Sequence, residues 1–218
     1  QTSSGYHKLK DMPLTFPIIN VGRSQLKLNY EAPLIAWTLT DKLKERFSRL
    51  SHLPNKVAVI GSGPIGNAVY RFLQREDRFS ITHIKGSQEM QEYRGKWKEF
   101  EMIIGCTGKT LFQPEDFAHL HTGVLLVSAS YSDGEFNAAI LRQKANNISS
   151  CHQDISAQNV KLLNCGFPIN FDDHYETVDP EAFQLTRALL MTGIYQALET
   201  PPDPQLIDLD LDTQKYIE

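Results

Sequence analysis

The sequence predicts an α/β fold in which a doubly wound, mostly parallel sheet is flanked by helices. Two observations carry this prediction. Short apolar runs rich in β-branched residues recur along the chain, and helical patterns separate them. A glycine-rich turn, G-x-G-x-x-G at 61–66, directly follows one of these runs and opens an amphipathic helix.

Composition limits the classes of function. The chain has 218 residues, 41% of them hydrophobic, and a net charge of −4, which is ordinary for a globular protein. Without a long basic run there is no electrostatic case for nucleic acid, and no apolar stretch reaches the ~20 residues that cross a bilayer. The widely spaced cysteines, without a C-x-x-C pair, predict reduced thiols in a cytoplasmic compartment.

The first fifty residues are expected to be irregular and then helical. Residues 1–13 are polar and are expected to form a flexible N-terminal segment. The stretch 14–30 is expected to be loop and short strand, because Pro17 and Gly22 interrupt any helix. From Leu34 to Leu50 the apolar residues recur with helical spacing, which predicts a helix.

Five later segments are predicted to be strands, since each is a short apolar run next to glycines or polar residues. They are KVAVIG at 56–61, FSITHIKG at 79–86, FEMIIGCTG at 100–108, GVLLVSAS at 123–130 and VKLLNCG at 160–166. The crossover from Lys85 to Phe100 is too short for a further helix and strand. We therefore expect the sheet to lack the third strand of a full doubly wound unit.

A terminal helix is predicted from Asp179, which is a good N-cap, with Pro180 in its first turn. Prolines at 201, 202 and 204 end it. The segment LIDLDLD that follows alternates apolar and acidic residues, which suits an edge strand and a solvated tail equally well. The expected organisation is one domain over 14–200 and a C-terminal tail over 201–218.

The glycine turn has the pattern of a Rossmann-type dinucleotide site. Gly61 would make the tight turn out of the strand, Gly63 would leave room for a pyrophosphate, and Gly66 would let helix and strand approach closely. The helix N-terminus would attract the phosphates. The residues expected to contact the cofactor here are Gly61, Ser62, Gly63, Pro64, Ile65 and Gly66. The alternative is a purely structural turn in a protein whose pocket has degenerated.

The sequence leaves NAD and NADP open, and it predicts weak discrimination between them or a preference for NADP. Sites for NAD usually carry an acid about 20 residues after the glycines, at the end of the second strand, to bind the ribose hydroxyls. That strand end holds His83 and Lys85 instead. A carboxylate would repel a 2′-phosphate, whereas His83 and Lys85 could accept one. Lys85 could equally be an ordinary surface lysine.

From Leu14 to Leu198 the motifs follow one order, and in that order they resemble the cofactor domain of the S-adenosylhomocysteine hydrolase family. The segments that carry the resemblance are LTFPIINVGRSQLKLNY at 14–30, KVAVIGSGPIG at 56–66, IIGCTGKTLFQPEDFAHLHTGVLLVSASYSDGEF at 103–136 and LLNCGFP at 162–168. The resemblance implies a bound NAD that oxidises a substrate hydroxyl. It also implies Lys27 as the group that accepts the hydroxyl proton, with Glu31 standing where the family has an aspartate.

The same resemblance implies that Thr107 and Gly108 lie beside the nicotinamide ribose and that Asn164 contacts the nicotinamide amide. The sequence also departs from the family. Gly22, Ala32 and Ala36 replace an asparagine, an asparagine and a cysteine, and His83 replaces the ribose-binding acid. The family's substrate domain has no counterpart in this sequence, so a missing domain or a partner chain is expected to complete the site, and a homo-oligomer is a further expectation.

Two functions follow from these observations. The chain is the cofactor half of an oxidoreductase that acts on a hydroxylated small molecule, or it is a non-catalytic module that binds or senses a nucleotide. Other candidate residues favour ordinary roles: Cys165 as a packing residue, His119 and His121 as solvent-facing side chains, and FDDHYE at 171–176 as a polar surface loop. No metal site is expected.

Overall fold

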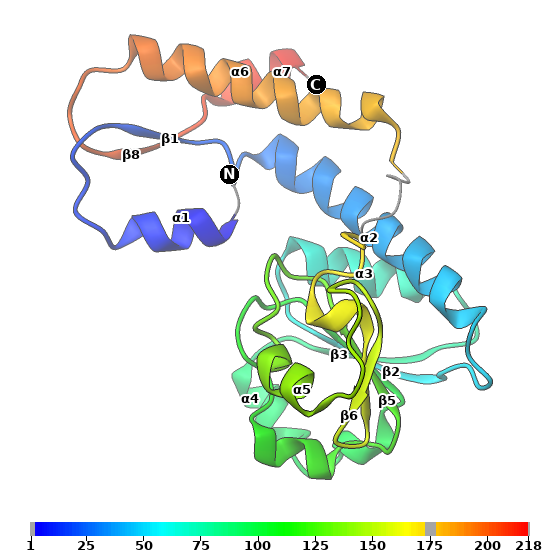
Figure 1. Ribbon diagram of the computed structural model, residues 1–218. Helices are drawn as coiled ribbons and strands as arrows, with labels where there is room; N and C mark the ends of the chain where they lie inside the picture. The colour runs from blue at the N-terminus through cyan, green and yellow to red at the C-terminus, as the bar shows by residue number, and fades with distance from the viewer. Residues whose placement is uncertain (1–2, 173–177, 218) are drawn as a thin grey trace. The chain divides into compact units, whose positions relative to one another are not determined.

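The computed structural model describes residues 3–172 and 178–217. The chain divides into two compact units (Figure 1). Unit 1 combines the two ends of the chain, Gln1–Leu34 and Glu176–Glu218, and unit 2 is the continuous segment Ile35–Tyr175. This division differs from the single domain that we expect over 14–200.

Unit 2 is built on a six-stranded sheet with the order β3-β2-β4-β5-β7-β6. Its strands are β2 (Lys56–Ile60), β3 (Ser80–Ile84), β4 (Met102–Gly105), β5 (Val124–Ser128), β6 (Ile155–Ala157) and β7 (Val160–Leu162). All neighbouring pairs are parallel except β6 and β7, which are antiparallel. The five predicted strands are confirmed, and β6 is an additional strand.

The sheet order places a reversal of winding between β2 and β4. The chain first moves from β2 to β3 on one side and then returns to add β4 on the other side. Only α4 (Ser87–Glu92) and a short 3-10 helix, η1 (Trp97–Glu99), lie between β3 and β4. The absence of a third strand from this crossover is confirmed, and β3 is an edge strand.

The core of unit 2 lies around this sheet. The residues of β4 and β5 are at most 5% exposed where they are apolar, which explains their continuous apolar runs. Helix α3 (Pro64–Leu73) packs on β2 and β3 with Val69 and Leu73 buried. Three short helices complete the unit: α5 (Ala138–Lys144), η2 (Pro114–His119) and η3 (Leu163–Gly166).

Helix α2 begins earlier than the sequence predicts. It runs from Gln25 to Phe47, with Pro33 in its interior. The predicted apolar face is confirmed in its second half, where Leu39 and Leu43 are fully buried. The predicted start at Leu34 is wrong because Pro33, which cannot donate a helical hydrogen bond, is accommodated inside the helix rather than at its first turn.

Unit 1 pairs the two ends of the chain. Strand β1 (Ile18–Asn20) runs parallel to β8 (Leu206–Asp208), and the Asn20 amide donates to Asp208 at 2.8 Å. Helices α1 (Ser3–Lys10), α6 (Gln184–Glu199) and α7 (Leu211–Ile217) complete the unit, with η4 (Pro180–Phe183) before α6. Residues 3–10 of the segment expected to be flexible form α1, and the tail contains β8 followed by α7.

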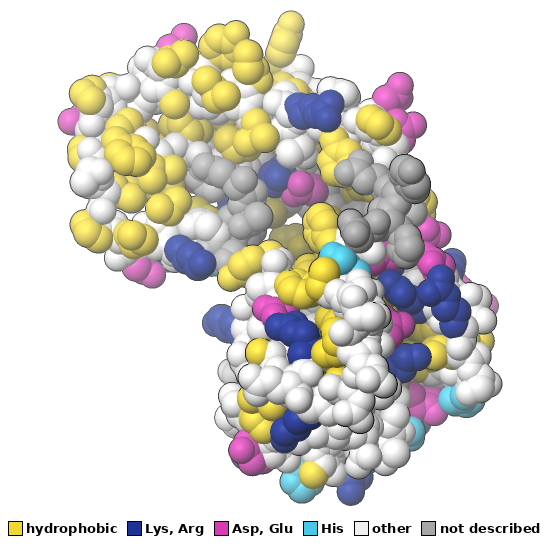
Figure 2. Space-filling model, viewed as in Figure 1, with side chains coloured by type: hydrophobic (Ala, Val, Ile, Leu, Met, Phe, Trp, Pro, Cys, Tyr) yellow, Lys and Arg dark blue, Asp and Glu magenta, His cyan; other side chains and the backbone are white. Residues whose placement is uncertain are grey.

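The predicted terminal helix is confirmed. The Asp179 carboxylate accepts a hydrogen bond from Glu181 N at 2.9 Å, as an N-cap does. One side of α6 packs in the small core of unit 1 through Leu189. Its other side exposes Leu190, Met191, Ile194, Tyr195 and Leu198, and hydrophobic side chains gather on the face of unit 1 seen in Figure 2.

Candidate functional site

Two loops meet at the carboxyl ends of β2 and β4. Cys106 N donates to Ile60 O at 2.8 Å, and Gly61 N donates to Ile84 O at the same distance. Residues 61 and 106 therefore lie side by side where the sheet reverses its winding. In open α/β sheets this is the place where ligands bind.

The turn at Gly61 requires glycine. Its φ is +125°, a backbone conformation that side chains rarely adopt, and a Cβ there would lie 2.9 Å from Cys106 O. At Gly66 a Cβ would collide with Gly61 O, so only glycine allows α3 to approach the end of β2 this closely. These two glycines set the geometry of the turn.

Gly63 stands in a different environment. It is the N-cap of α3, no side chain caps this helix end, and a Cβ built at Gly63 would have no atom within 4 Å. The amides in the first turn of a helix have no partner within the helix, and the helix dipole adds positive potential there. The backbone around Gly63 can therefore receive an anionic group.

His83 is hydrogen-bonded to the glycine turn. Its Nε2 lies 2.8 Å from Gly61 O, and its ring stacks on Tyr70 with the centroids 4.6 Å apart. Because the carbonyl oxygen can only accept, Nε2 carries the proton in this bond. The imidazole thus stabilises the glycine turn. It occupies the strand end at which NAD sites usually carry the acid that binds the ribose.

A carboxylate does lie near this strand end, but on the next helix. Glu89 of α4 accepts a hydrogen bond from Lys85 N at 2.7 Å, and the Lys85 side chain is exposed. Ser62 Oγ donates to Lys85 O at 3.0 Å, which ties this segment to the glycine turn. The sequence analysis missed Glu89, although an acid three residues after Gly86 is a common signal for a helix start.

The loop after β4 is fixed by Glu135, a fully buried residue that the sequence analysis also missed. Its Oε1 accepts from Thr107 N at 2.6 Å, Thr107 Oγ1 at 3.0 Å and Gly108 N at 2.9 Å. No local pattern marks Glu135, because its donors are more than twenty residues away in sequence. The carboxylate holds Thr107 and Gly108 in place.

Cys106 lies between the glycine turn and this loop. Burial holds the pKa of the Cys106 thiol well above its usual value, and the negative charge of Glu135 raises it further. Cys165 also has a raised pKa, chiefly through burial, although Arg142 opposes the shift. Both thiols are therefore neutral near pH 7, which does not favour a nucleophilic role.

Asn164 is fully buried in the turn that follows β7. Its Nδ2 donates to Pro168 O at 2.8 Å and to Phe171 O at 3.0 Å, and its Oδ1 lies 3.1 Å from His152 Nδ1. Both polar atoms of the side chain are thus engaged within the protein. Asn164 orders the segment 164–171, and a ligand could reach its amide only if this segment opened.

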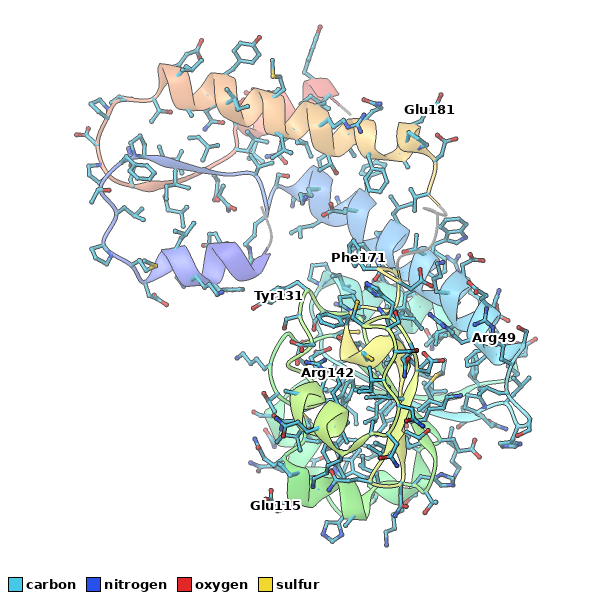
Figure 3. All side chains as sticks on the ribbon, in the orientation of Figure 1. Arg49, Glu115, Tyr131, Arg142, Phe171 and Glu181 are labelled. Atoms are coloured by element: carbon cyan, nitrogen blue, oxygen red, sulfur yellow. The ribbon has the colours of Figure 1, made fainter. Side chains whose placement is uncertain are left out.

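Three cationic side chains support this segment and Asp172, which follows it. Arg142, labelled in Figure 3, donates to Cys165 O at 2.7 Å and lies over the Phe167 ring. Asp172 is 4% exposed and pairs with Lys42 at 3.0 Å and Arg46 at 3.3 Å, both on α2. Asp172 is therefore a buried ionic residue and not part of a polar surface loop; residues 173–176 of FDDHYE lie outside the described residues.

The two predicted catalytic residues lie in unit 1. Lys27 is 8% exposed, and its Nζ lies 2.9 Å from Glu31 Oε1 one helical turn away. Within residues 3–172 and 178–217, no group of three or more His, Cys, Asp or Glu side chains is arranged to hold a metal ion. Over the same residues, no helix has the length and apolar character needed to cross a membrane.

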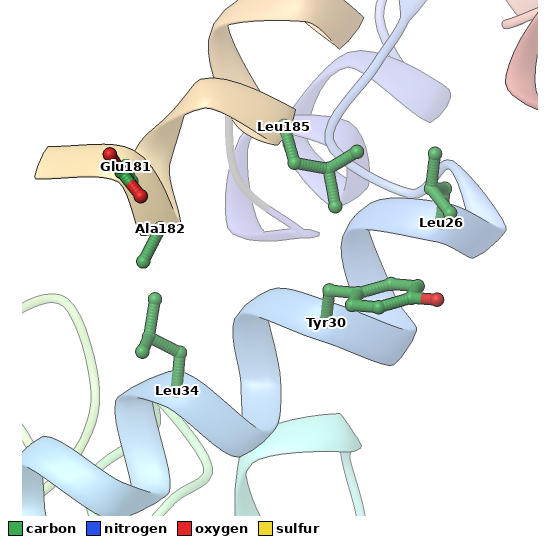
Figure 4. Close-up of a pocket in the computed structure, with 6 residues that line it drawn as sticks. All are labelled: Leu26, Tyr30, Leu34, Glu181, Ala182 and Leu185. Atoms are coloured by element: carbon green, nitrogen blue, oxygen red, sulfur yellow. The ribbon is translucent and has the colours of Figure 1, made fainter. Parts of the chain in front are cut away.

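Unit 1 also contains a shallow hollow of about 420 Å³ (Figure 4). It is lined by Leu26, Tyr30, Leu34, Glu181, Ala182 and Leu185. Most of this lining is apolar, and Glu181 is its only charged side chain among the described residues. The sequence analysis did not predict this hollow. Its lining comes from two segments far apart in the sequence, and periodicity within a short window cannot show that they meet.

Comparisons with known proteins extend these observations. No family model matches the chain. Two proteins from two strains of Mycobacterium tuberculosis, both described as uncharacterized, are 36% identical over 205 residues. The match covers 90% of this chain and 40% of each relative, so the chain spans less than half the length of the curated relatives it matches.

A solved structure is also similar, that of a D-isomer specific 2-hydroxyacid dehydrogenase from Xanthobacter autotrophicus Py2. It has 16% sequence identity and a TM-score of 0.41, and the match covers 81% of this chain and 75% of that one. Similarity at this level carries no inference about activity. The strand order, the reversal between β2 and β4, and the glycine turn show that unit 2 has a Rossmann-type fold.

Proposed function

We propose that unit 2 binds a nicotinamide dinucleotide, NAD or NADP, across the carboxyl ends of β2 and β4. The observation that carries the proposal is the glycine turn. Gly61 and Gly66 admit no side chain, while Gly63 faces open space at a helix N-terminus without a side-chain cap. This is the cradle that a pyrophosphate needs.

Each predicted cofactor residue then has a distinct role. The backbone from Ser62 through Pro64 and Ile65 to Gly66 would surround the pyrophosphate. His83 and Lys85 stand on the β3 side, where the adenosine would lie, and His83 acts by holding Gly61 O. Thr107 and Gly108 stand on the β4 side for the nicotinamide ribose, and Asn164 would reach the nicotinamide amide only after its segment opened.

We expect NAD to bind more tightly than NADP. Glu89 brings a carboxylate to Lys85 N, and a negative charge there would repel a 2′-phosphate. His83, which the sequence offers as a phosphate ligand, is engaged with Gly61. We expect the repulsion by Glu89 and the engagement of His83 to outweigh the attraction of the exposed Lys85 ammonium for a 2′-phosphate.

Replacement of Gly63 by Asp tests the pyrophosphate site. The carboxylate would enter the space that the proposal assigns to the phosphates, so binding of all four coenzymes, NAD+, NADH, NADP+ and NADPH, should be lost in calorimetry. The fold should persist, because nothing lies within 4 Å of the new Cβ. Gly95→Asp is the matched control, since Gly95 has equally open surroundings and lies outside the site. Unchanged affinity of Gly63→Asp would refute the proposed site.

Redox chemistry is a further proposal, and the resemblance to S-adenosylhomocysteine hydrolase supports it. Lys27 would accept the proton of a substrate hydroxyl, with Glu31 as its ionic partner at 2.9 Å. The substrate would be a hydroxylated small molecule, such as a nucleoside. Because the relatives are longer than this chain, a further domain, a partner chain or a second copy would contribute to substrate recognition.

A second candidate function is nucleotide binding or sensing without chemistry. The burial of Asn164 favours it, since both polar atoms of its side chain already have partners in the protein. An assay of coenzyme reduction with a panel of alcohols separates the two functions. Turnover that Lys27→Ala abolishes and Lys215→Ala retains supports the oxidoreductase; coenzyme binding without any turnover supports the sensor. Lys215 is a suitable control because it also forms an ion pair within a helix of unit 1.

A further inference from the structure

The buried carboxylate of Glu135 has a consequence beyond holding a loop. We propose that Glu135 makes the coenzyme site prefer the oxidised nicotinamide, which carries a positive charge, over the reduced and neutral form. The inference rests on the proposed function and adds a residue that sets which redox form of the ligand is bound. It follows from the contacts, the charge and the position of Glu135.

The contacts of Glu135 suit a negative charge. Three donors from Thr107 and Gly108 converge on Oε1, and Ser128 Oγ lies 3.2 Å from Oε2. Two of the donors are backbone amides, which can only donate. Such a set of donors stabilises a carboxylate in the protein interior, where burial would otherwise penalise it.

Hydrogen bonds spread this charge but do not cancel it. Among the described residues, no lysine, arginine or histidine forms an ion pair with Glu135. After burial, the charge of Glu135 is the second cause that raises the pKa of Cys106. A site beside Glu135 therefore has a negative potential that a cationic ligand can satisfy.

The position of Glu135 places this potential on one half of the proposed ligand. Its partners follow β4 and end β5, and a Cβ built at Gly105 would lie 2.6 Å from Oε2. The acid that binds the adenosine ribose in this fold stands at the end of the strand equivalent to β3, on the other side of β2. The nicotinamide half consequently lies on the side of β4 and β5, with Glu135.

The test compares the affinities of the full chain for NAD+ and NADH, measured by calorimetry at low ionic strength. If NADP proves to be the ligand, NADP+ and NADPH are used. The wild-type chain should bind the oxidised form more tightly. Glu135→Gln keeps an oxygen for the three donors on Oε1 and removes the charge. It should weaken binding of the oxidised form on the order of tenfold and change the reduced form little.

Glu101→Gln is the matched control. Glu101 also accepts two backbone N–H bonds, from Asn55 and Lys56, but it precedes β4 at the opposite end of the strand. This variant should leave the ratio of the two affinities unchanged. If Glu101→Gln changed this ratio as much as Glu135→Gln does, the proposal would be wrong. The ratio would then not depend on a charge near the nicotinamide.

The remaining outcomes are equally decisive. If Glu135→Gln weakens both redox forms by the same factor, Glu135 only supports the loop and the proposal is wrong. If that variant does not fold, the wild-type chain still decides, because tighter binding of the reduced form would overturn the proposal. If the wild-type chain binds neither form, the proposed function itself fails, and this result is distinct from an altered ratio.

Discussion

At the scale of single residues, two glutamates show how backbone amides hold a carboxylate in this protein. Glu135 and Glu101 each accept two backbone N–H bonds, at opposite ends of β4. Neither bond set could be predicted from the sequence, since the donors of Glu135 lie 27 and 28 positions away and those of Glu101 lie 45 and 46 positions away. Only the closing of the parallel sheet brings these groups together.

Glu101 should make stability depend on pH in the acidic range. The Asn55 N–H is the main cause that lowers its pKa from 4.5, partly opposed by burial and assisted by Lys56 N–H and His52. The folded-state pKa is therefore below the unfolded one. The stabilisation is complete above about pH 4.5 and is lost as the pH falls through the lowered folded-state value.

Glu101→Gln tests this linkage. Denaturant unfolding should show a loss of about 1 kcal/mol near neutral pH. The glutamine oxygen can still accept the two hydrogen bonds, but bonds to a neutral acceptor contribute less than bonds to a carboxylate. Below pH 4.5 the difference between variant and wild type should shrink. A constant difference across the whole pH range would contradict the assignment.

At the scale of elements, the sequence predicts most of unit 2 and less of unit 1. Buried parallel strands such as β4 and β5 are recognisable because both faces are covered, which makes them continuous apolar runs. Strand β6 was not predicted, because its three residues acquire their strand conformation from pairing with β7. Helix α1 was not predicted either, since its polar sequence carries little apolar periodicity.

The candidate site also contains a part that the sequence predicts and a part that it does not. The glycine turn was predictable because each glycine answers a local steric demand, which the φ of Gly61 and the surroundings of Gly66 display. Asn164 could be located by resemblance, but its burial and its partners could not. These depend on His152, 12 positions before Asn164, and on the carbonyl groups of Pro168 and Phe171, which fold back onto the turn.

Asp172 provides a prediction for the element α2. Its carboxylate is the shared partner of Lys42 and Arg46, which are both at most 7% exposed. Asp172→Asn removes the charge nearest to both buried cations and leaves them only the longer pairs with Glu45 at 3.7 Å and Asp154 at 3.9 Å. The substitution should cost about 3 kcal/mol in the free energy of unfolding.

Thermal and denaturant unfolding measure this cost. Asp212→Asn is the control, because Asp212 pairs with Lys215 on the surface of α7 and is 89% exposed. The control should change stability by less than about 0.5 kcal/mol. Equal effects of the two substitutions would show that burial does not set the strength of the Asp172 pairs.

At the scale of the whole molecule, the proposed ligand should act on one unit. All of the proposed coenzyme contacts lie in unit 2, whereas Lys27 and Glu31, which we propose to act on the substrate, lie in unit 1. Coenzyme at about 100 times its dissociation constant should stabilise the folded state by about 2.7 kcal/mol. Hydrogen exchange followed by mass spectrometry should therefore show slower exchange in β2 and β4.

The amides of α6 and β8, in unit 1, serve as internal controls and should exchange at the same rate with and without coenzyme. Protection that is equal in the two units would contradict the assignment of the site to unit 2. The division into units was itself not predictable from composition. No linker rich in glycine, proline or serine marks residue 35, since the boundary falls inside the continuous helix α2.

The pairing of β1 with β8 bears on how the chain is made. Asn20 and Asp208 are 188 positions apart, so during translation the first strand emerges from the ribosome long before its partner exists. The segment that forms unit 2 is continuous and can fold as soon as it has been synthesised. Unit 2 can therefore fold first, and β1 stays without its partner until residues 206–208 have been synthesised.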